Sequence, residues 1–517
     1  MIRSFYDVVV VGSRLGGLSA AALLAKRGFR VLVLGHDDLG PTYELGGEAL
    51  PRAPFSFLPA HSPIARRVFA ELAITQAFRR QAAVVDPAFQ VALPGHRVDL
   101  PLDPVHLERE IDREFPEVKR PALDLFARTR ASSLALDRAV ERDLVWPPET
   151  FFERRELARA ISHLQPPPAD RRSAPPDHDD PLRELPDTHP LRLVVHAPAR
   201  FADGMDPDQV GALRLLRHFS SWREGGAVIE GGAASLRELL EGSIRAHGGE
   251  LRGRDKIDAI LVKRGTVEGV RIAASGEEIG ASFVLLGSDV GAFLRVVPDR
   301  RPFEELFERV GEPVARYYRY TLNLQLRAEG VPAGMARDVF FVRDPSRPLS
   351  GANLLHVEAH PADAKGRRLL CVEALLPRRG VEDVAEYLDT IREHVVASLG
   401  ELVPFLGSNL LWMDSPHDGR HAQDFVRGGL IEPEAKWARG RHTMDTVYGY
   451  PIASALGVCA LPVRTPVKRL LLANAQVVPG LGLEGQLLAA WSAARIVSRS
   501  DRRPAILRRG LWTKLES

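Results

Sequence analysis

Three glycines near the N-terminus have the spacing of a phosphate-binding turn. Gly12, Gly16 and Gly17 follow an apolar run at residues 8–11 and precede a stretch of small and apolar residues at 18–26. In a dinucleotide-binding unit the first glycine makes a tight turn, and the amides of the next helix point at an anionic diphosphate. The pattern predicts a βαβ unit with cofactor contacts at Gly12, Ser13, Arg14, Gly16 and Gly17.

Arg14 departs from this pattern, because it stands where a second glycine lets the backbone approach the diphosphate. Three interpretations remain open. The guanidinium pairs with the diphosphate, or it points into solvent, or it fills an empty diphosphate site and pairs with Glu48. The third interpretation leaves the fold without its cofactor.

Gly35 is the second departure. It follows the returning strand at residues 30–34, where an acid normally binds the ribose hydroxyls. Gly35 followed by His36 would suit the 2′-phosphate of an NADP-type cofactor. Asp37 or Asp38 could instead replace the ribose acid if the strand ended later.

Two further glycine-rich blocks must complete the sheet. Residues 224–289 contain a glycine turn, a helix and short strands at 256–263, 267–272 and 283–286. Residues 469–495 contain a short strand, a Pro-Gly turn and an alanine-rich helix. The start of that helix could direct amides at a ligand from Leu483, Glu484, Gly485 and Gln486.

The middle of the chain is predicted to mix helices and strands. Residues 63–77, 104–115, 123–143, 207–219, 236–247 and 384–399 have helical patterns, and residues 319–326, 339–342, 353–358 and 369–376 have strand patterns. The proline-rich residues 162–190 predict a surface excursion. Asp414, His417 and His421 could edge a pocket, although Pro416 and Gly419 favour a loop over a metal-binding helix.

Composition limits the function classes. The 517 residues exceed what one core usually supports, so we expect two or more domains. The 69 basic and 67 acidic residues give a net charge of +2, which provides no global field for nucleic acid. Two cysteines are too few for a disulfide framework, and the first residues lack a cleavable leader. We expect a cytoplasmic protein, whose membrane contact would be peripheral.

In this order, the three blocks resemble the flavin-dependent phytoene desaturase, carotenoid isomerase and retinol saturase family, a branch of the amine-oxidase-like flavoproteins. The resemblance implies an α/β fold with a Rossmann-like FAD domain from residues 1–75, 225–300 and 465–500. It implies a mixed α+β substrate domain from residues 76–224 and 301–464 for long apolar isoprenoids. It places Ile257 near the adenine of FAD, and Asn474 with residues 483–486 near the flavin.

The resemblance also makes Gly46, Gly47 and Glu48 the counterpart of a Gly-Gly-Arg segment, which puts a negative charge beside the diphosphate. Two hypotheses follow. The first is an FAD-dependent oxidoreductase acting on an isoprenoid or another long apolar molecule, with its catalytic residues unassigned. The second is a cofactor-free relative that acts as a binding or assembly partner.

The C-terminal residues 501–517 form a basic tail. Residues 502–514 alternate basic and apolar side chains and include Trp512, which would suit an anionic membrane surface. The alternative is a solvated, frayed terminus.

Overall fold

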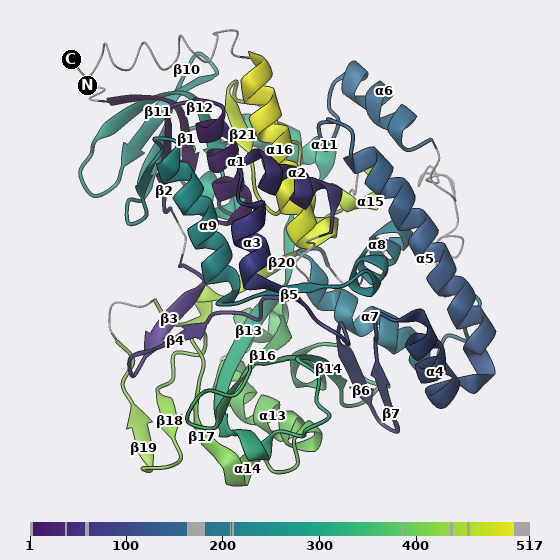
Figure 1. The fold of residues 1–517 in the computed structure, drawn as a ribbon. Helices are drawn as coiled ribbons and strands as arrows, with labels where there is room; N and C mark the ends of the chain where they lie inside the picture. The colour runs from purple at the N-terminus through teal and green to yellow at the C-terminus, as the bar shows by residue number, and fades with distance from the viewer. Residues whose placement is uncertain are drawn as a thin grey trace.

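The computed structural model describes residues 4–36, 39–56, 61–162, 181–206, 208, 211–384, 386–434, 438–451 and 455–500. Two sheets with helices on their faces make up this part of the chain (Figure 1). The α/β fold expected from the sequence is confirmed. The basic tail and most of the proline-rich stretch, residues 163–180, lie outside the described residues.

The first sheet has the strand order β10-β11-β12-β1-β2-β9, with β21 beside β12. Its parallel strands are β1 (Ser4–Val11), β2 (Val31–Leu34), β9 (Glu250–Arg252), β12 (Glu278–Leu286) and β21 (Leu470–Leu472). An antiparallel extension comprises β10 (Ile257–Lys263) and β11 (Thr266–Ile272). Residues 8–11 of β1 are fully buried, as helices on both faces of a parallel sheet require.

Three helices cover this sheet around the glycine turn: α1 (Leu15–Lys26), α9 (Gly232–Ala246) and α16 (Gly482–Ser500). Helix α1 packs against both of the others. Gly16, Gly17 and the alanines at 20–22 are buried, and their small size allows this close approach.

The second sheet has the order β19-β18-β17-β13-β16-β15-β14-β6-β7, with β20 beside β13. Its strands are β6 (Gln90–Leu93), β7 (His96–Asp99), β13 (Val314–Arg327), β14 (Asp338–Val342), β15 (Leu354–Ala359), β16 (Arg367–Pro377), β17 (Leu410–Asp414), β18 (Ala422–Asp424), β19 (Gly429–Ile431) and β20 (Asp445–Gly449). The central pair, β13 and β16, is antiparallel from Tyr317 opposite Pro377 to Arg327 opposite Arg367.

Two small antiparallel two-stranded sheets lie outside the large sheets. They are β3 (Thr42–Leu45) with β4 (Glu48–Pro51), and β5 (Ala82–Val84) with β8 (Ala227–Ile229). The other helices are α2 (Pro63–Glu71), α3 (Thr75–Gln81), α4 (Pro104–Glu114), α5 (Lys119–Val140), α6 (Phe151–Ala160), α7 (Pro190–Ala202), α8 (Ala212–Arg223), α10 (Val290–Leu294), α11 (Arg301–Val310), α12 (Arg378–Asp383), α13 (Tyr387–Leu402), α14 (Leu406–Asn409) and α15 (Ala455–Val458).

One predicted helix is divided. Residues 63–77 form α2 and part of α3, because the backbone of Ala73 takes a positive φ of 59° between them. The remaining predicted helices and strands of the middle region are present with shifted ends. Helix α4 begins at Pro104 as predicted, because the side chain of Asp103 accepts hydrogen bonds from the amides of Val105 and His106, and it ends one residue earlier, at Glu114.

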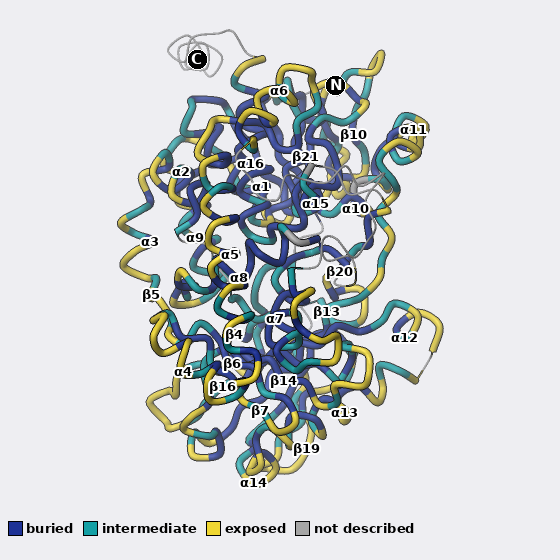
Figure 2. The backbone as a smooth tube through the Cα atoms, turned by 90° about the vertical axis from the view of Figure 1, so that its right-hand side faces the viewer, coloured by how far each residue is buried: buried dark blue, intermediate teal, exposed yellow. Residues whose placement is uncertain are grey.

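Buried residues run through both halves of the molecule (Figure 2). The core around the first sheet also includes Leu136, Trp146 and Leu157, which belong to the stretch assigned to the substrate domain from sequence. Trp146 is anchored there, since its amide donates to Ser492 Oγ of α16 at 2.9 Å. We retain the two-domain division as a proposal. Among the described residues, no helix is both long and apolar enough to cross a membrane.

Candidate cofactor site

The glycine turn joins β1 to α1 at the carboxyl end of the first sheet. Gly12 has a φ of +98°, and a Cβ there would lie 2.5 Å from the amide nitrogen of Ser288. A Cβ on Gly16 would lie 2.5 Å from the carbonyl oxygen of Ala473, and one on Gly17 would lie 2.6 Å from that of Gly12. These glycines therefore allow the turn to pack against β12 and the segment after β21.

A cavity of about 270 Å³ lies beside this turn, where the two sheets meet. Apolar side chains from α1 and α9 line one part of it: Leu15, Leu18, Leu236 and Leu240. Four arginines also line it: Arg14, Arg52, Arg237 and Arg319. The cavity therefore combines an apolar wall with an excess of positive charge, a composition that suits an anionic ligand with an apolar part.

Arg14 crosses the cavity toward the second sheet. It occupies the N-cap of α1, and its guanidinium lies 2.8 Å from Asp445 Oδ1 of β20. Enclosure raises the pKa of the Asp445 carboxyl, but attraction by Arg14 outweighs this and holds the pKa below its usual value. Both side chains are nearly half exposed, so this ion pair is accessible from the cavity.

Of the three interpretations of Arg14, the one that pairs it with Glu48 is wrong. Gly46 and Gly47 form the tight turn between β3 and β4, with φ of +57° and +82°, so this segment is a hairpin. Glu48 Oε1 lies 2.8 Å from a guanidinium nitrogen of Arg367 in β16. Its carboxylate is therefore held at the second sheet and cannot neutralise Arg14 at the glycine turn.

Arg237 supplies a second cation at the turn. Its Nε donates to Glu241 Oε1 at 2.8 Å, and another guanidinium nitrogen donates to Ser13 Oγ at 3.0 Å. These bonds hold the guanidinium against the turn. Arg14 and Arg237 together give this end of the cavity the donors that a diphosphate requires.

The missing ribose acid has a packing explanation. A Cβ on Gly35 would lie 1.9 Å from the carbonyl oxygen of Gly253, so an acidic side chain has no room there. His36 is buried, and its Nδ1 accepts a hydrogen bond from the amide of Ile257 at 3.3 Å. This inward position gives no support to a 2′-phosphate site. Asp37 and Asp38 lie outside the described residues.

The C-terminal block contributes less to the cavity than its sequence suggested, because Gln486 lines it but Leu483, Glu484 and Gly485 do not. Glu484 forms a buried bidentate ion pair with Arg217, at 2.9 and 2.6 Å. Burial raises the pKa of Glu484, but attraction by Arg217 reverses this and holds the pKa below its usual value. Gly485 packs against the Val478 carbonyl.

Two other predicted contacts have structural roles. Asn474 is buried, and its Nδ2 donates to the carbonyl of Ser288 at 2.8 Å, which ties the C-terminal segment to the end of β12. Ile257 is buried in the first core at the start of β10. Neither residue lines the cavity.

The second sheet supplies residues that sequence reasoning missed or only partly identified. Arg319, Thr443 and Asp445 line the cavity together with His417. His417 Nδ1 lies 2.8 Å from Thr443 Oγ1, and burial lowers the pKa of the imidazole to about 4. His417 is therefore neutral at pH 7. No local pattern marks Arg319 or Asp445, because only the pairing of β13 with β20 brings them together.

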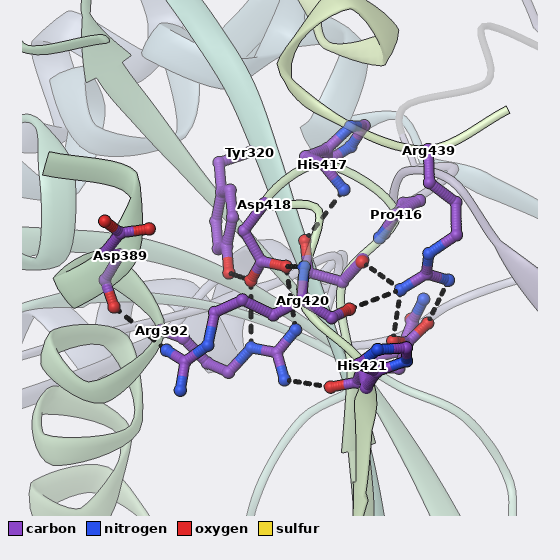
Figure 3. Close-up of polar contacts among 12 residues, drawn as sticks. Tyr320, Asp389, Arg392, Pro416, His417, Asp418, Arg420, His421 and Arg439 are labelled. Atoms are coloured by element: carbon purple, nitrogen blue, oxygen red, sulfur yellow. Dashed lines mark hydrogen bonds and ion pairs between the residues drawn. The ribbon is translucent and has the colours of Figure 1, made fainter. Parts of the chain in front are cut away.

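The loop that carries His417 is fixed by arginines (Figure 3). Arg392 holds Asp418 at 2.8 and 2.9 Å, and Tyr320 donates to the same carboxylate at 2.9 Å. Asp414 pairs with Arg439 at 2.9 and 2.6 Å. His421 is exposed and offers its carbonyl to Arg392, so the two histidines do not act as a pair. The described residues contain no group of three side chains suited to a metal ion.

Comparison with known proteins agrees with this geometry. Residues 10–72 match the NAD(P)-binding Rossmann-like domain family. A neurosporene-forming phytoene desaturase from Cereibacter sphaeroides is 26% identical over 316 residues, which cover 57% of this chain and 55% of the relative. The match thus spans about half the length of that curated relative.

Solved structures resemble nearly the whole chain. A cyclohexylamine oxidase from Brevibacterium oxydans aligns over 96% of this chain and 100% of its own, with a TM-score of 0.56 and 14% identity. An oxidoreductase from Methanosarcina mazei aligns over 94% and 99%, with a TM-score of 0.53 and 16% identity. The sequence match confirms the resemblance to a phytoene desaturase, and the solved oxidoreductases share the fold of this chain.

Proposed function

We propose that this protein is an FAD-dependent oxidoreductase of the phytoene desaturase type, which desaturates, saturates or isomerises a carotenoid, another isoprenoid or a similar long apolar molecule. The observation that carries the proposal is the cavity between the glycine turn and the second sheet, in a chain similar to a phytoene desaturase. Unrelated chemistries share this fold, so the substrate class rests on that similarity.

The cavity residues fit FAD at its diphosphate. Arg14 and Arg237 would neutralise the diphosphate beside the α1 amides, and the leucines of α1 and α9 would contact apolar parts of the cofactor. FAD, when bound, supplies the hydride or electron transfer. Because Gly35 leaves no room for a ribose acid at that position, Arg14 and Arg237 would supply the charged contacts to the cofactor among the described residues. Arg14 would then exchange its contact with Asp445 for a contact with the diphosphate.

Where the cavity meets the second sheet, Arg319 and Arg14 have acidic partners, as an apolar substrate there requires. Arg319 lies 2.9 Å from Glu373, and Arg14 is neutralised by Asp445 or by the cofactor. His417 is uncharged at pH 7 because burial lowers its pKa to about 4. These groups would orient a substrate and exclude water without placing a lone charge against a polyene.

We do not propose the cofactor-free assembly partner. That hypothesis had Arg14 and Glu48 filling the diphosphate site together, but Arg14 pairs with Asp445 of β20 and Glu48 pairs with Arg367 of β16.

The proposal is tested by incubating FAD-loaded protein with phytoene and more highly conjugated polyenes in detergent micelles, once with a quinone as electron acceptor for desaturation and once with dithionite as electron donor for saturation. We expect new polyene absorption bands that depend on added flavin, and none with flavin-stripped protein. Flavin-loaded protein that leaves every polyene unchanged would contradict the substrate class, whereas failure to load would contradict the cofactor.

A further inference from the structure

A second cavity, of about 370 Å³, lies between α4, α5 and α8, apart from the residues that line the cofactor cavity. Leu102, Leu107, Leu123 and Phe126 form its apolar walls. Arg130 of α5 and Arg223 of α8 also line it. Pockets of this size that combine apolar walls with a few convergent polar groups are typical small-molecule sites.

Arg223 differs from the other arginines of its helix. Arg214 forms a buried ion pair with Asp203, and Arg217 forms one with Glu484. Among the described residues, Arg223 has no acidic partner within salt-bridge distance, and its Nε is buried without a hydrogen-bond partner. Its guanidinium lies 5.6 Å from the centre of the Phe126 ring.

The neighbouring Arg130 makes a charged guanidinium at Arg223 less favourable. Burial lowers the pKa of Arg223, and repulsion by Arg130 lowers it further. Glu224 also lines the cavity, but its carboxylate forms no ion pair with Arg223 and lies 3.5 Å from His61 Nε2. Because proteins seldom leave a half-buried cation without a counter-charge, the missing charge points to a ligand.

We propose that this cavity binds a small amphiphilic anion, whose carboxylate or phosphate head lies between Arg130 and Arg223 and whose apolar body lies against Leu107, Leu123 and Phe126. The guanidinium of Arg223 is already positioned by the Phe126 ring. The site requires neither FAD nor the proposed reaction, so it stands independently of the proposed function.

Decanoate, kept below its micelle concentration, is the probe, with binding measured by isothermal titration calorimetry on the full-length protein. We expect one saturable site per chain, weakened about tenfold or more in R223Q and also weakened in R130Q. Acetate and decanol should bind more weakly than decanoate, because each lacks one half of the ligand. Added salt should also weaken binding.

The matched control is R128Q, on the same helix as Arg130. Arg128 lies 3.6 Å from Glu184 and does not line the cavity, so its substitution should leave decanoate affinity unchanged. R223Q should keep or raise the melting temperature, because the lost guanidinium has no acidic partner; loss of binding then cannot reflect unfolding. Phosphatidylglycerol vesicles distinguish a lipid headgroup from a free acid, and R223Q should not alter any vesicle binding.

Three results would overturn the proposal: no saturable decanoate binding to the unmodified protein, equal affinity in R223Q, or equal affinity for acetate. If the first result were accompanied by vesicle binding that depends on Arg223, the surface would be a membrane contact instead.

Discussion

Replacing Gly35 should destabilise the protein, even though an acid at this position would restore the usual ribose-binding pattern. A Cβ built there lies 1.9 Å from the carbonyl oxygen of Gly253, whereas real Cβ atoms keep at least 3.0 Å from such atoms. The Gly253 carbonyl would therefore have to move by about 1 Å (3.0 − 1.9). The Gly35 amide donates a hydrogen bond to the neighbouring Arg252 carbonyl at 3.2 Å, and this bond limits that movement.

Overpacking of this kind costs roughly 1–3 kcal/mol. We expect Gly35→Ala to lower the free energy of unfolding in urea by about this amount, and Gly35→Glu to lower it by at least as much. Gly35→Glu should not improve the affinity for FAD in a fluorescence titration, because the side chain cannot reach a ribose without displacing the Gly253 backbone.

Gly400→Ala is the matched control. Gly400 lies within α13, and a Cβ there meets no atom within 4 Å. The same substitution should therefore stabilise the protein by about 0.5–1 kcal/mol, since alanine favours a helix over glycine. The packing argument is refuted if Gly35→Glu retains full stability and binds FAD more tightly than the unmodified protein.

Four further predictions concern charged and titrating groups. Arg14→Gln should weaken FAD binding at least about tenfold, whereas Asp445→Asn should strengthen it by removing a competitor for Arg14, both measured by flavin fluorescence. Glu484→Gln should lower the free energy of unfolding in urea by about 3 kcal/mol, because it leaves the buried charge of Arg217 partly uncompensated. The protein that remains folded should bind FAD as before. Burial lowers the pKa of His417 to about 4, so the unfolded chain takes up a proton at a higher pH than the folded one. The free energy of unfolding should therefore fall by about 3 kcal/mol between pH 6.5 and 4. His417→Asn should remove this pH dependence. The pH dependence from His356 has the opposite sign. Burial lowers its pKa, but a hydrogen bond to Asp338 and the Glu373 carboxylate 3.6 Å away raise the pKa to about 9. Its contribution to stability should therefore be full below pH 6.5 and lost toward pH 9, and His356→Gln should remove this pH dependence.

Local patterns predicted the elements around the turn well. The apolar run at residues 8–11, the three glycines and the returning strand are consecutive in sequence, and they form β1, α1 and β2. Buried runs and small residues fix these elements without long-range information.

The site could be predicted only in part, because several of its contacts join distant segments. Glu484 pairs with Arg217, and Arg14 pairs with Asp445, through contacts that no local spacing reveals. Gly46 and Gly47 matched a family motif in composition, but two successive positive φ values make them a hairpin turn. The clash at Gly35 likewise depends on Gly253, which only the β2–β9 pairing brings near.

The flavin content of freshly purified protein tests the central claim most directly. The absorption spectrum should show the two visible flavin bands, with one FAD released per chain on denaturation, and stripped protein should bind added FAD saturably. A colourless protein that also fails to bind added FAD would contradict the account, because the arginine-lined cavity beside the glycine turn would then not be a flavin site.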